Sequence, residues 1–141
     1  MEILMRAQAL IPGEVAGELI VSNEPLSFWG GYDPATGEIT DRRHPLSGEI
    51  AAGKILALPF TRGSSTTTAV LLEAQRLGNA PRALITSGVD AFLSLASIVA
   101  DELYQRPIPV YALEEADFHR LNSGDQVDLD RDGTIKVTSV G

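Results

Sequence analysis

The chain has 141 residues, 44% of them hydrophobic and 21% charged, which is enough for one ordinary domain with a hydrophobic core. Its net charge of -8 arises from 19 acidic and 11 basic residues, a balance that argues against nucleic acid or an anionic membrane as a partner. It contains no cysteine, which excludes disulfides and an iron–sulfur cluster held by thiolates of this chain. We expect a single domain over residues 1–141 that binds no metal.

The sequence also bears on location and ligands. The segment Met1–Arg6 lacks the apolar run of a signal peptide, and no apolar stretch approaches the roughly 20 residues that span a bilayer. We therefore expect a soluble cytoplasmic protein without a membrane partner. The basic residues are scattered apart from Arg42-Arg43, but one well-placed arginine could still bind a small anionic substrate.

Two pairs of apolar runs predict β-hairpins, one at each end of the chain. Near the N-terminus, Ala7–Ile11 and Val15–Val21 flank the turn sequence Pro12-Gly13-Glu14. Near the C-terminus, Gly124–Leu129 and Thr134–Val137 alternate between apolar and polar residues around a Gly-containing turn. The aspartates of that turn lack the spacing of a calcium-binding EF-hand, so we interpret them as solvated.

Between these ends, a long loop precedes an alternation of strands and helices. The loop, Asn23–Gly48, is rich in Gly, Pro, Asp and Ser, yet it carries Phe28, Trp29 and Tyr32, and so we expect it to be packed and ordered. The segments after it are predicted as strand (Ile55–Leu58), helix (from Thr66 to Leu77), strand (Ala83–Ile85), helix (Asp90–Tyr104) and strand (Pro107–Tyr111). Such alternation predicts an α/β fold with parallel strands and right-handed crossovers.

The segment Arg62-Gly63-Ser64-Ser65 lies where ligands usually bind in such folds, between a strand and the helix that follows it. Gly63 permits a close approach of the backbone, and Arg62 can bind a carboxylate or a phosphate. The serines have two interpretations at this point. They could cap the helix, which is the commoner role of serine at such a position, or one of them could act as a base near the positive end of the helix dipole.

Two familiar kinds of active site are poorly supported. The segment lacks the lysine and the glycine spacing of a P-loop. A Ser-His-Asp hydrolase is also unsupported, because Gly63-Ser64-Ser65 is not a nucleophile elbow and His44 and His119 are the only histidines. We interpret His44 as a loop-packing residue and His119 as a surface residue.

A series of motifs runs through most of the chain in a fixed order. They are Pro25–Ile39 (PLSFWGGYDPATGEI), Asp41 with His44-Pro45-Leu46, Gly53-Lys54-Ile55-Leu56, Pro59, Gly63-Ser64-Ser65 and Ala80–Ile85. Together they resemble the small subunit of aconitase X enzymes. The resemblance implies a swivelling β/β/α domain with a central, mostly parallel sheet, flanking helices and peripheral β-hairpins.

The resemblance also implies a function. Aconitase X enzymes are hydro-lyases in which a large subunit carries a cysteine-bound iron centre, so this chain would be active only as a heterodimer with such a subunit. The Gly-Ser-Ser loop presents the catalytic base, which here is Ser64, while Gly63 and Ser65 contact the substrate. Aconitase has an arginine after the serines, but this chain has Thr66, and we therefore predict that Arg62 binds the substrate carboxylate.

Two substrates are known in the family, cis-3-hydroxy-L-proline and a phosphorylated mevalonate. One arginine with a distant Lys54 provides little positive charge for a phosphate, and so the sequence favours cis-3-hydroxy-L-proline. The alternatives are the phosphomevalonate dehydratase of an isoprenoid pathway and a non-catalytic swivelling or anion-binding module. A phosphohistidine carrier would need a histidine in the mobile loop, and residues 60–68 contain none.

Overall fold

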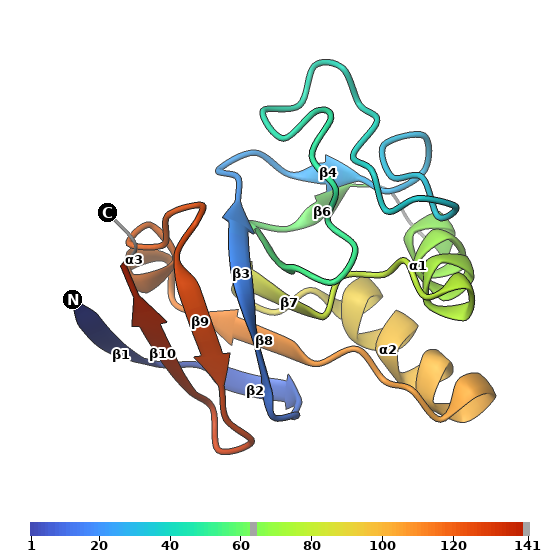
Figure 1. The fold of residues 1–141 in the computed structure, drawn as a ribbon. Coiled ribbons are helices and arrows are strands. Elements are labelled where there is room, and N and C mark those ends of the chain that lie inside the picture. The colour runs from blue at the N-terminus through green and yellow to red at the C-terminus, as the bar shows by residue number, and fades with distance from the viewer. Residues whose placement is uncertain (63–64, 140–141) are drawn as a thin grey trace.

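The computed structural model describes residues 1–62 and 65–139 of the chain (Figure 1). The elements, in chain order, are β1 (Glu2–Arg6), β2 (Gln8–Ile11), β3 (Val15–Val21), β4 (Leu26–Ser27), β5 (Ile55–Leu58), β6 (Thr61–Arg62), α1 (Ser65–Leu77), β7 (Ala83–Ser87), α2 (Ala91–Tyr104), β8 (Val110–Leu113), α3 (Glu115–Phe118), β9 (Gln126–Leu129) and β10 (Thr134–Thr138). Eight strands form one sheet in the order β1-β10-β9-β3-β5-β7-β8-β2, and β4 pairs with β6 beside it.

The centre of the sheet is parallel and its margins are antiparallel. Strands β3, β5, β7 and β8 pair in parallel, with Leu19 opposite Ile55 and Ile55 opposite Ala83. Helix α1 connects β5 to β7 and helix α2 connects β7 to β8, as the alternation of the sequence predicts. The four residues of β5 are all buried, as are those of β8, because parallel strands of this kind are covered on both faces.

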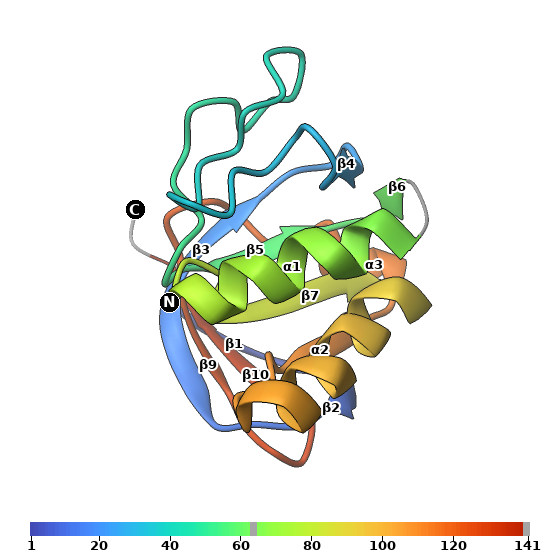
Figure 2. The ribbon, with the colours of Figure 1, turned by 90° about the vertical axis from the view of Figure 1, so that its right-hand side faces the viewer.

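Successive residues of the central strands point into two different cores. Leu56 and Leu58 of β5 belong to a helix-side core that also contains residues of α1, α2 and the long loop. Ile55 and Ala57 of the same strand belong to a strand-side core, which β1, β9, β10 and Phe118 of α3 complete. Figure 2 shows α1 and α2 side by side over one face of the parallel strands, and Figure 1 shows β1, β9 and β10, an antiparallel margin of the same sheet, on the side of these strands away from the helices. These are the β/β/α layers that the resemblance predicts.

The prediction of an N-terminal hairpin is wrong. Strand β2 pairs with β8 at one margin of the sheet, whereas β3 pairs with β5 and β9 near its middle. The turn at Gly13 is attached to β8 instead: the Tyr111 hydroxyl accepts from the Gly13 N–H (3.1 Å) and donates to the Gly13 carbonyl (2.7 Å). The turn residues are present, but both strands pair with strands that lie far along the chain.

The other predicted elements differ mainly at their ends. The C-terminal hairpin is confirmed as β9 and β10. Strand β8 begins at Val110 and not at Pro107, since proline has no N–H for the sheet. Strand β1 and the single turn of α3 were not predicted; the four residues of α3 are too few to show a helical period.

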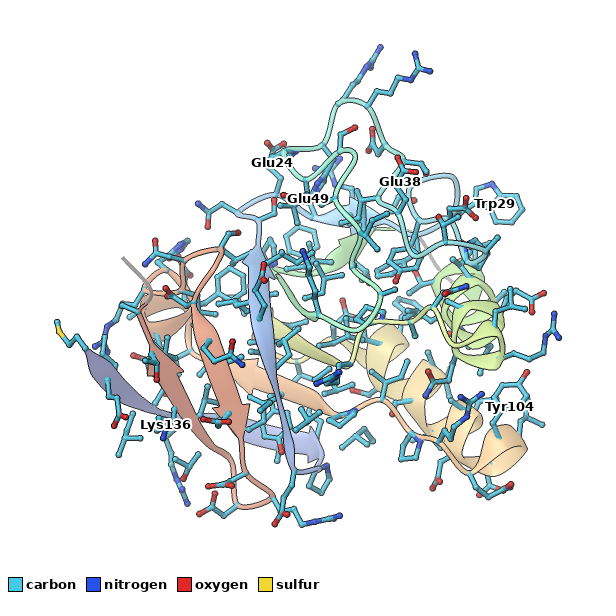
Figure 3. All side chains as sticks on the ribbon, in the orientation of Figure 1. Glu24, Trp29, Glu38, Glu49, Tyr104 and Lys136 are labelled. Carbon is cyan, nitrogen blue, oxygen red and sulfur yellow. The ribbon has the colours of Figure 1, made fainter. Side chains whose placement is uncertain are left out.

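The long loop is packed, as its aromatic residues predict. Phe28 and Tyr32 are buried with their ring centroids 5.2 Å apart, and both belong to the helix-side core. Trp29 between them is 69% exposed and points away from the body of the domain (Figure 3). Phe28 and Tyr32 therefore pack the loop into the core, whereas Trp29 does not.

The segment between β1 and β2 ties the two margins of the sheet together. Ala7 is the single residue between these strands, which lie at opposite ends of the strand order. Its N–H donates to the carbonyl of Gly133 in the β9–β10 turn (2.8 Å), and a Cβ on Gly133 would collide with the Ala7 carbonyl oxygen. Gly133 also has a φ of 96°, so this crossing requires glycine for two reasons.

A pair of glycine substitutions separates these two reasons. Gly124 has a similar φ of 94°, but nothing lies within 4 Å of the position its Cβ would take. We predict that Gly124→Ala lowers the free energy of unfolding by about 1–2 kcal/mol through backbone strain alone. Gly133→Ala adds a steric term and should lower it by about 1–3 kcal/mol more. Chemical denaturation measures both; equal losses would contradict the close packing at Ala7.

Candidate functional site

The described part of the site predicted from the sequence lies at the carboxyl end of the central parallel strands. After Leu58 the chain forms the short strand β6, in which Arg62 pairs with Ser27 of β4, and α1 begins at Ser65. Gly63 and Ser64 lie outside the residues that the structure describes, as does the side chain of Ser65. What the structure describes of this segment is therefore Arg62 and the backbone start of α1, and both lie at the edge of the sheet where α/β folds bind ligands.

A buried carboxylate fixes the strand that leads into this segment. Asp90 is 7% exposed and caps α2, with one oxygen accepting from the N–H groups of Phe92 (3.0 Å) and Leu93 (3.1 Å). Its other oxygen accepts from both the N–H (2.7 Å) and the hydroxyl (2.8 Å) of Thr61. The sequence identifies Asp90 as the start of a helix, but it gives no sign of the contact with Thr61.

Arg62 borders a hollow between β6 and the long loop. The hollow has a volume of about 290 Å³ and is lined by Glu24, Pro25, Ser27, Asp41, Arg43, His44 and Arg62. Arg62 is exposed and forms no salt bridge with the acidic side chains that the structure describes. Two arginines and two carboxylates share this lining, so positive and negative charge are balanced around it. Such a hollow suits a small polar ligand better than a strongly anionic one.

His44 is a packing residue of this hollow, as predicted. It is 6% exposed, and its Nδ1 accepts from the Leu46 N–H (3.1 Å). The ring proton is therefore assigned to Nε2, which donates to the Glu24 carbonyl (3.2 Å). His44 thus joins the two sides of the loop. His119 is a surface residue, with 56% of its side chain exposed next to Glu115.

The aromatic loop has an anchor that sequence reasoning missed. The Tyr32 hydroxyl donates to the Asn79 carbonyl (2.8 Å), and the Asn79 side chain donates to the carbonyls of Pro34 (3.1 Å) and Ala35 (2.9 Å). Burial raises the pKa of Tyr32 above its ordinary value, which keeps the hydroxyl protonated and able to donate. The loop is therefore attached to the end of α1, the helix that follows the candidate site.

Neither a metal site nor a membrane segment is found in the described part of the chain. In residues 1–62 and 65–139, no three histidine or acidic side chains gather closely enough to hold a metal ion. None of the helices within the same ranges is both long and apolar enough to cross a membrane.

Comparisons with known proteins connect this geometry to a family. The family model described as the aconitase X swivel domain matches residues 4–137. The chain is 42% identical over 136 residues to cis-3-hydroxy-L-proline dehydratase of Hypocrea jecorina, covering 96% of this chain and 23% of the relative. It is 35% identical over 134 residues to the phosphomevalonate dehydratase small subunit of Thermococcus gammatolerans, covering 94% of this chain and 96% of the relative. The chain thus spans less than a quarter of the first relative and nearly all of the second.

A solved structure agrees with the sequence matches. The crystal structure of aconitase X from Thermococcus kodakaraensis (holo-form) superimposes with a TM-score of 0.86 at 31% identity, covering 97% of this chain and 99% of the solved one. The likeness therefore extends over nearly the whole chain.

The hydrogen bonds of His44 can be tested with two substitutions. In His44→Asn the side-chain oxygen can still accept from the Leu46 N–H, while the contact with Glu24 is lost. In His44→Ala both contacts are lost, and a buried cavity is added. We predict that the free energy of unfolding falls by about 1 kcal/mol for His44→Asn and by about 2–3 kcal/mol for His44→Ala. Equal losses in thermal or chemical denaturation would contradict the role given to Nδ1.

Proposed function

Because the chain belongs to the aconitase X swivel-domain family, which matches residues 4–137, we propose that it forms part of a dehydratase whose active site is shared with a larger polypeptide. The family match is the observation that carries this proposal. The names of the relatives support it, since both the longer relative and the small subunit are dehydratases. The proposed partner is a large aconitase X subunit, with which the chain forms a heterodimer.

In this proposal Ser64 is the base that removes a proton from the substrate. Its place in the sequence, between Arg62 and the first residue of the 13-residue helix α1, would put its hydroxyl near the N–H groups of the first helical turn. Those groups and the helix dipole stabilise negative charge, which lowers the free energy needed to ionise a serine hydroxyl. Gly63 permits close approach of the substrate, and Ser65 orients it or caps α1.

Arg62 is proposed to bind the carboxylate of the substrate. Two features support the assignment: the residue is exposed, and it borders the hollow between β6 and the long loop. A guanidinium can hold a carboxylate through two parallel hydrogen bonds, which fixes the orientation of the substrate as well as its position.

An iron centre does not fit the residues of this chain. The sequence has no cysteine, and the described histidine and acidic side chains form no group that could hold a metal ion. We place the iron or iron–sulfur centre on the large subunit. The contribution of this chain is then limited to the base, to substrate binding and to exclusion of water when the swivelling domain closes.

We propose cis-3-hydroxy-L-proline as the substrate. Identity to the relatives named for it is 42–45%, against 32–36% for the phosphomevalonate dehydratase small subunits. Charge supports the same choice. Lys54 lies before the first residue of β5, at the end of that strand remote from Arg62, and its amine is 3.5 Å from a Glu18 carboxylate. It therefore adds no positive charge to the site that could bind a phosphate.

Phosphomevalonate remains the second candidate because of one observation. Relatives named phosphomevalonate dehydratase small subunit are 32–36% identical to this chain. Assaying the assembled complex with each compound decides between them. The third candidate, a non-catalytic swivelling or anion-binding module, requires that neither compound loses water at a rate that depends on Ser64.

Removal of the Ser64 hydroxyl tests the base. In the complex with the large subunit, we predict that Ser64→Ala lowers kcat by about 10²–10⁴-fold, since this is the usual contribution of a general base. KM and the stability of the complex should change little, because the substrate contacts assigned to Arg62 remain. Steady-state kinetics and size-exclusion chromatography measure these quantities. Normal turnover by the assembled variant would remove Ser64 from the mechanism.

Removal of the Arg62 charge tests substrate binding. We predict that Arg62→Gln raises KM for cis-3-hydroxy-L-proline by about 10–100-fold, which corresponds to the loss of a charge-assisted hydrogen bond of about 1.5–3 kcal/mol. The matched control is Arg131→Gln, which removes the same charge from the exposed β9–β10 turn and should leave KM unchanged. A similar rise in both variants would indicate a general effect of net charge and not a contact with the substrate.

A further inference from the structure

Asp90 forms more hydrogen bonds than the cap of a helix requires. Capping α2 uses one carboxylate oxygen, which accepts from the N–H groups of Phe92 and Leu93. The second oxygen accepts two hydrogen bonds from Thr61, at 2.7 and 2.8 Å, although Thr61 is 29 residues earlier in the chain. The buried charge is thus satisfied by four donors, and two of them belong to a different element of the fold.

The donor to this second oxygen lies immediately before the candidate site. Thr61 precedes Arg62 and is three positions before Ser64. The segment is held at a second point as well, where the Ser87 N–H donates to the Pro59 carbonyl (3.2 Å). Strand β6 itself has only two residues and pairs only with the equally short β4, which leaves it few contacts of its own. Its position therefore depends on the connection between β7 and α2.

We propose that Asp90 is a positioning residue, which holds Thr61 so that Arg62 and Ser64 are presented to the substrate in a fixed place. The inference rests on the proposed function of those two residues. Asp90 does not touch the substrate; it acts through Thr61. Small displacements of a catalytic group reduce turnover strongly, and a misplacement of about 1 Å can lower the rate about 100-fold. A buried, charged acceptor limits such displacement better than a neutral, exposed one.

Asp90→Asn separates capping from positioning. Asparagine is as good a helix cap as aspartate, so its oxygen can keep the contacts with Phe92 and Leu93. Its NH₂ group then faces Thr61 and cannot accept from the backbone N–H. In the complex with the large subunit, we expect kcat to fall about 10–100-fold and KM to rise, because both Ser64 and the substrate-binding Arg62 are displaced. Hydrogen–deuterium exchange of a peptide covering residues 59–66 should rise in the same complex.

Thr61 provides the complementary pair of variants. Thr61→Val removes the hydroxyl donor but keeps the N–H, and it should lower kcat by a smaller factor than Asp90→Asn. Thr61→Ser restores the hydroxyl and should restore kcat. Because both residues act through one contact, the double variant Asp90→Asn/Thr61→Val should be no slower than Asp90→Asn alone.

Ser97→Ala is the matched control for destabilisation of α2. Ser97 is also a buried polar residue of this helix, where its hydroxyl donates to the Ile108 carbonyl and accepts from the Ile108 N–H (2.8 Å). It is seven positions beyond Asp90, and among the described residues its hydroxyl bonds to Ile108 and not to β6, so its loss should lower stability without slowing turnover. An equal fall in kcat for Ser97→Ala and Asp90→Asn would overturn the inference.

The two readouts separate this inference from the proposed function. If exchange of residues 59–66 is unchanged in Asp90→Asn, Asp90 does not hold the segment and the inference fails, whatever the kinetics. If exchange rises but kcat is unchanged, the Ser64→Ala variant assayed beside it decides the cause. An inactive Ser64→Ala then overturns only the positioning role of Asp90, whereas an active Ser64→Ala overturns the proposed function of the loop.

Discussion

The parallel pairing of β5 with β7 is the constraint on which the rest of the structure depends. Both strands are short and buried, so both faces of the sheet must be covered. Parallel pairing also requires a crossover between partner strands: α1 connects β5 to β7, α2 connects β7 to β8, and the two helices cover one face together. Finally, it places the carboxyl ends of β5 and β7 at the same edge of the sheet. Arg62 follows the end of β5 and Asp90 follows the end of β7. Asp90 can therefore hold the segment that contains Arg62.

The second face of the sheet explains why the chain has so much antiparallel structure. Residues of β5 alternate between the two cores, and the side chains of Ile55 and Ala57 need a cover that the helices cannot provide. Strands β1, β9 and β10 supply it, and the crossing of Ala7 over Gly133 ties the two margins of the sheet together. The helix-side core then remains available to the long loop, whose Phe28 and Tyr32 belong to it. The walls of the hollow beside Arg62 are made by that loop.

The sequence predicts local features well and distant contacts poorly. Strand β5, both long helices and the C-terminal hairpin have clear periodicity and turn residues, and the structure confirms them. The N-terminal hairpin fails because its turn signal is local, while the true partners of β2 and β3 lie tens of residues away. The contact between Asp90 and Thr61 could not be predicted either, because the two residues are 29 positions apart. A helix cap can be recognised from the residues next to it. A hydrogen bond that its second oxygen accepts from a distant strand leaves no pattern in the sequence.

Our central proposal is that a serine of this chain acts on a substrate held largely by another polypeptide. A crystal structure of the assembled complex with bound substrate tests it most directly, through the distance from the Ser64 hydroxyl oxygen to the carbon that loses its proton. We predict a separation of about 3–3.5 Å, within reach for proton transfer, with the substrate carboxylate on Arg62. A closed complex in which that oxygen lies more than about twice as far from the carbon would contradict it.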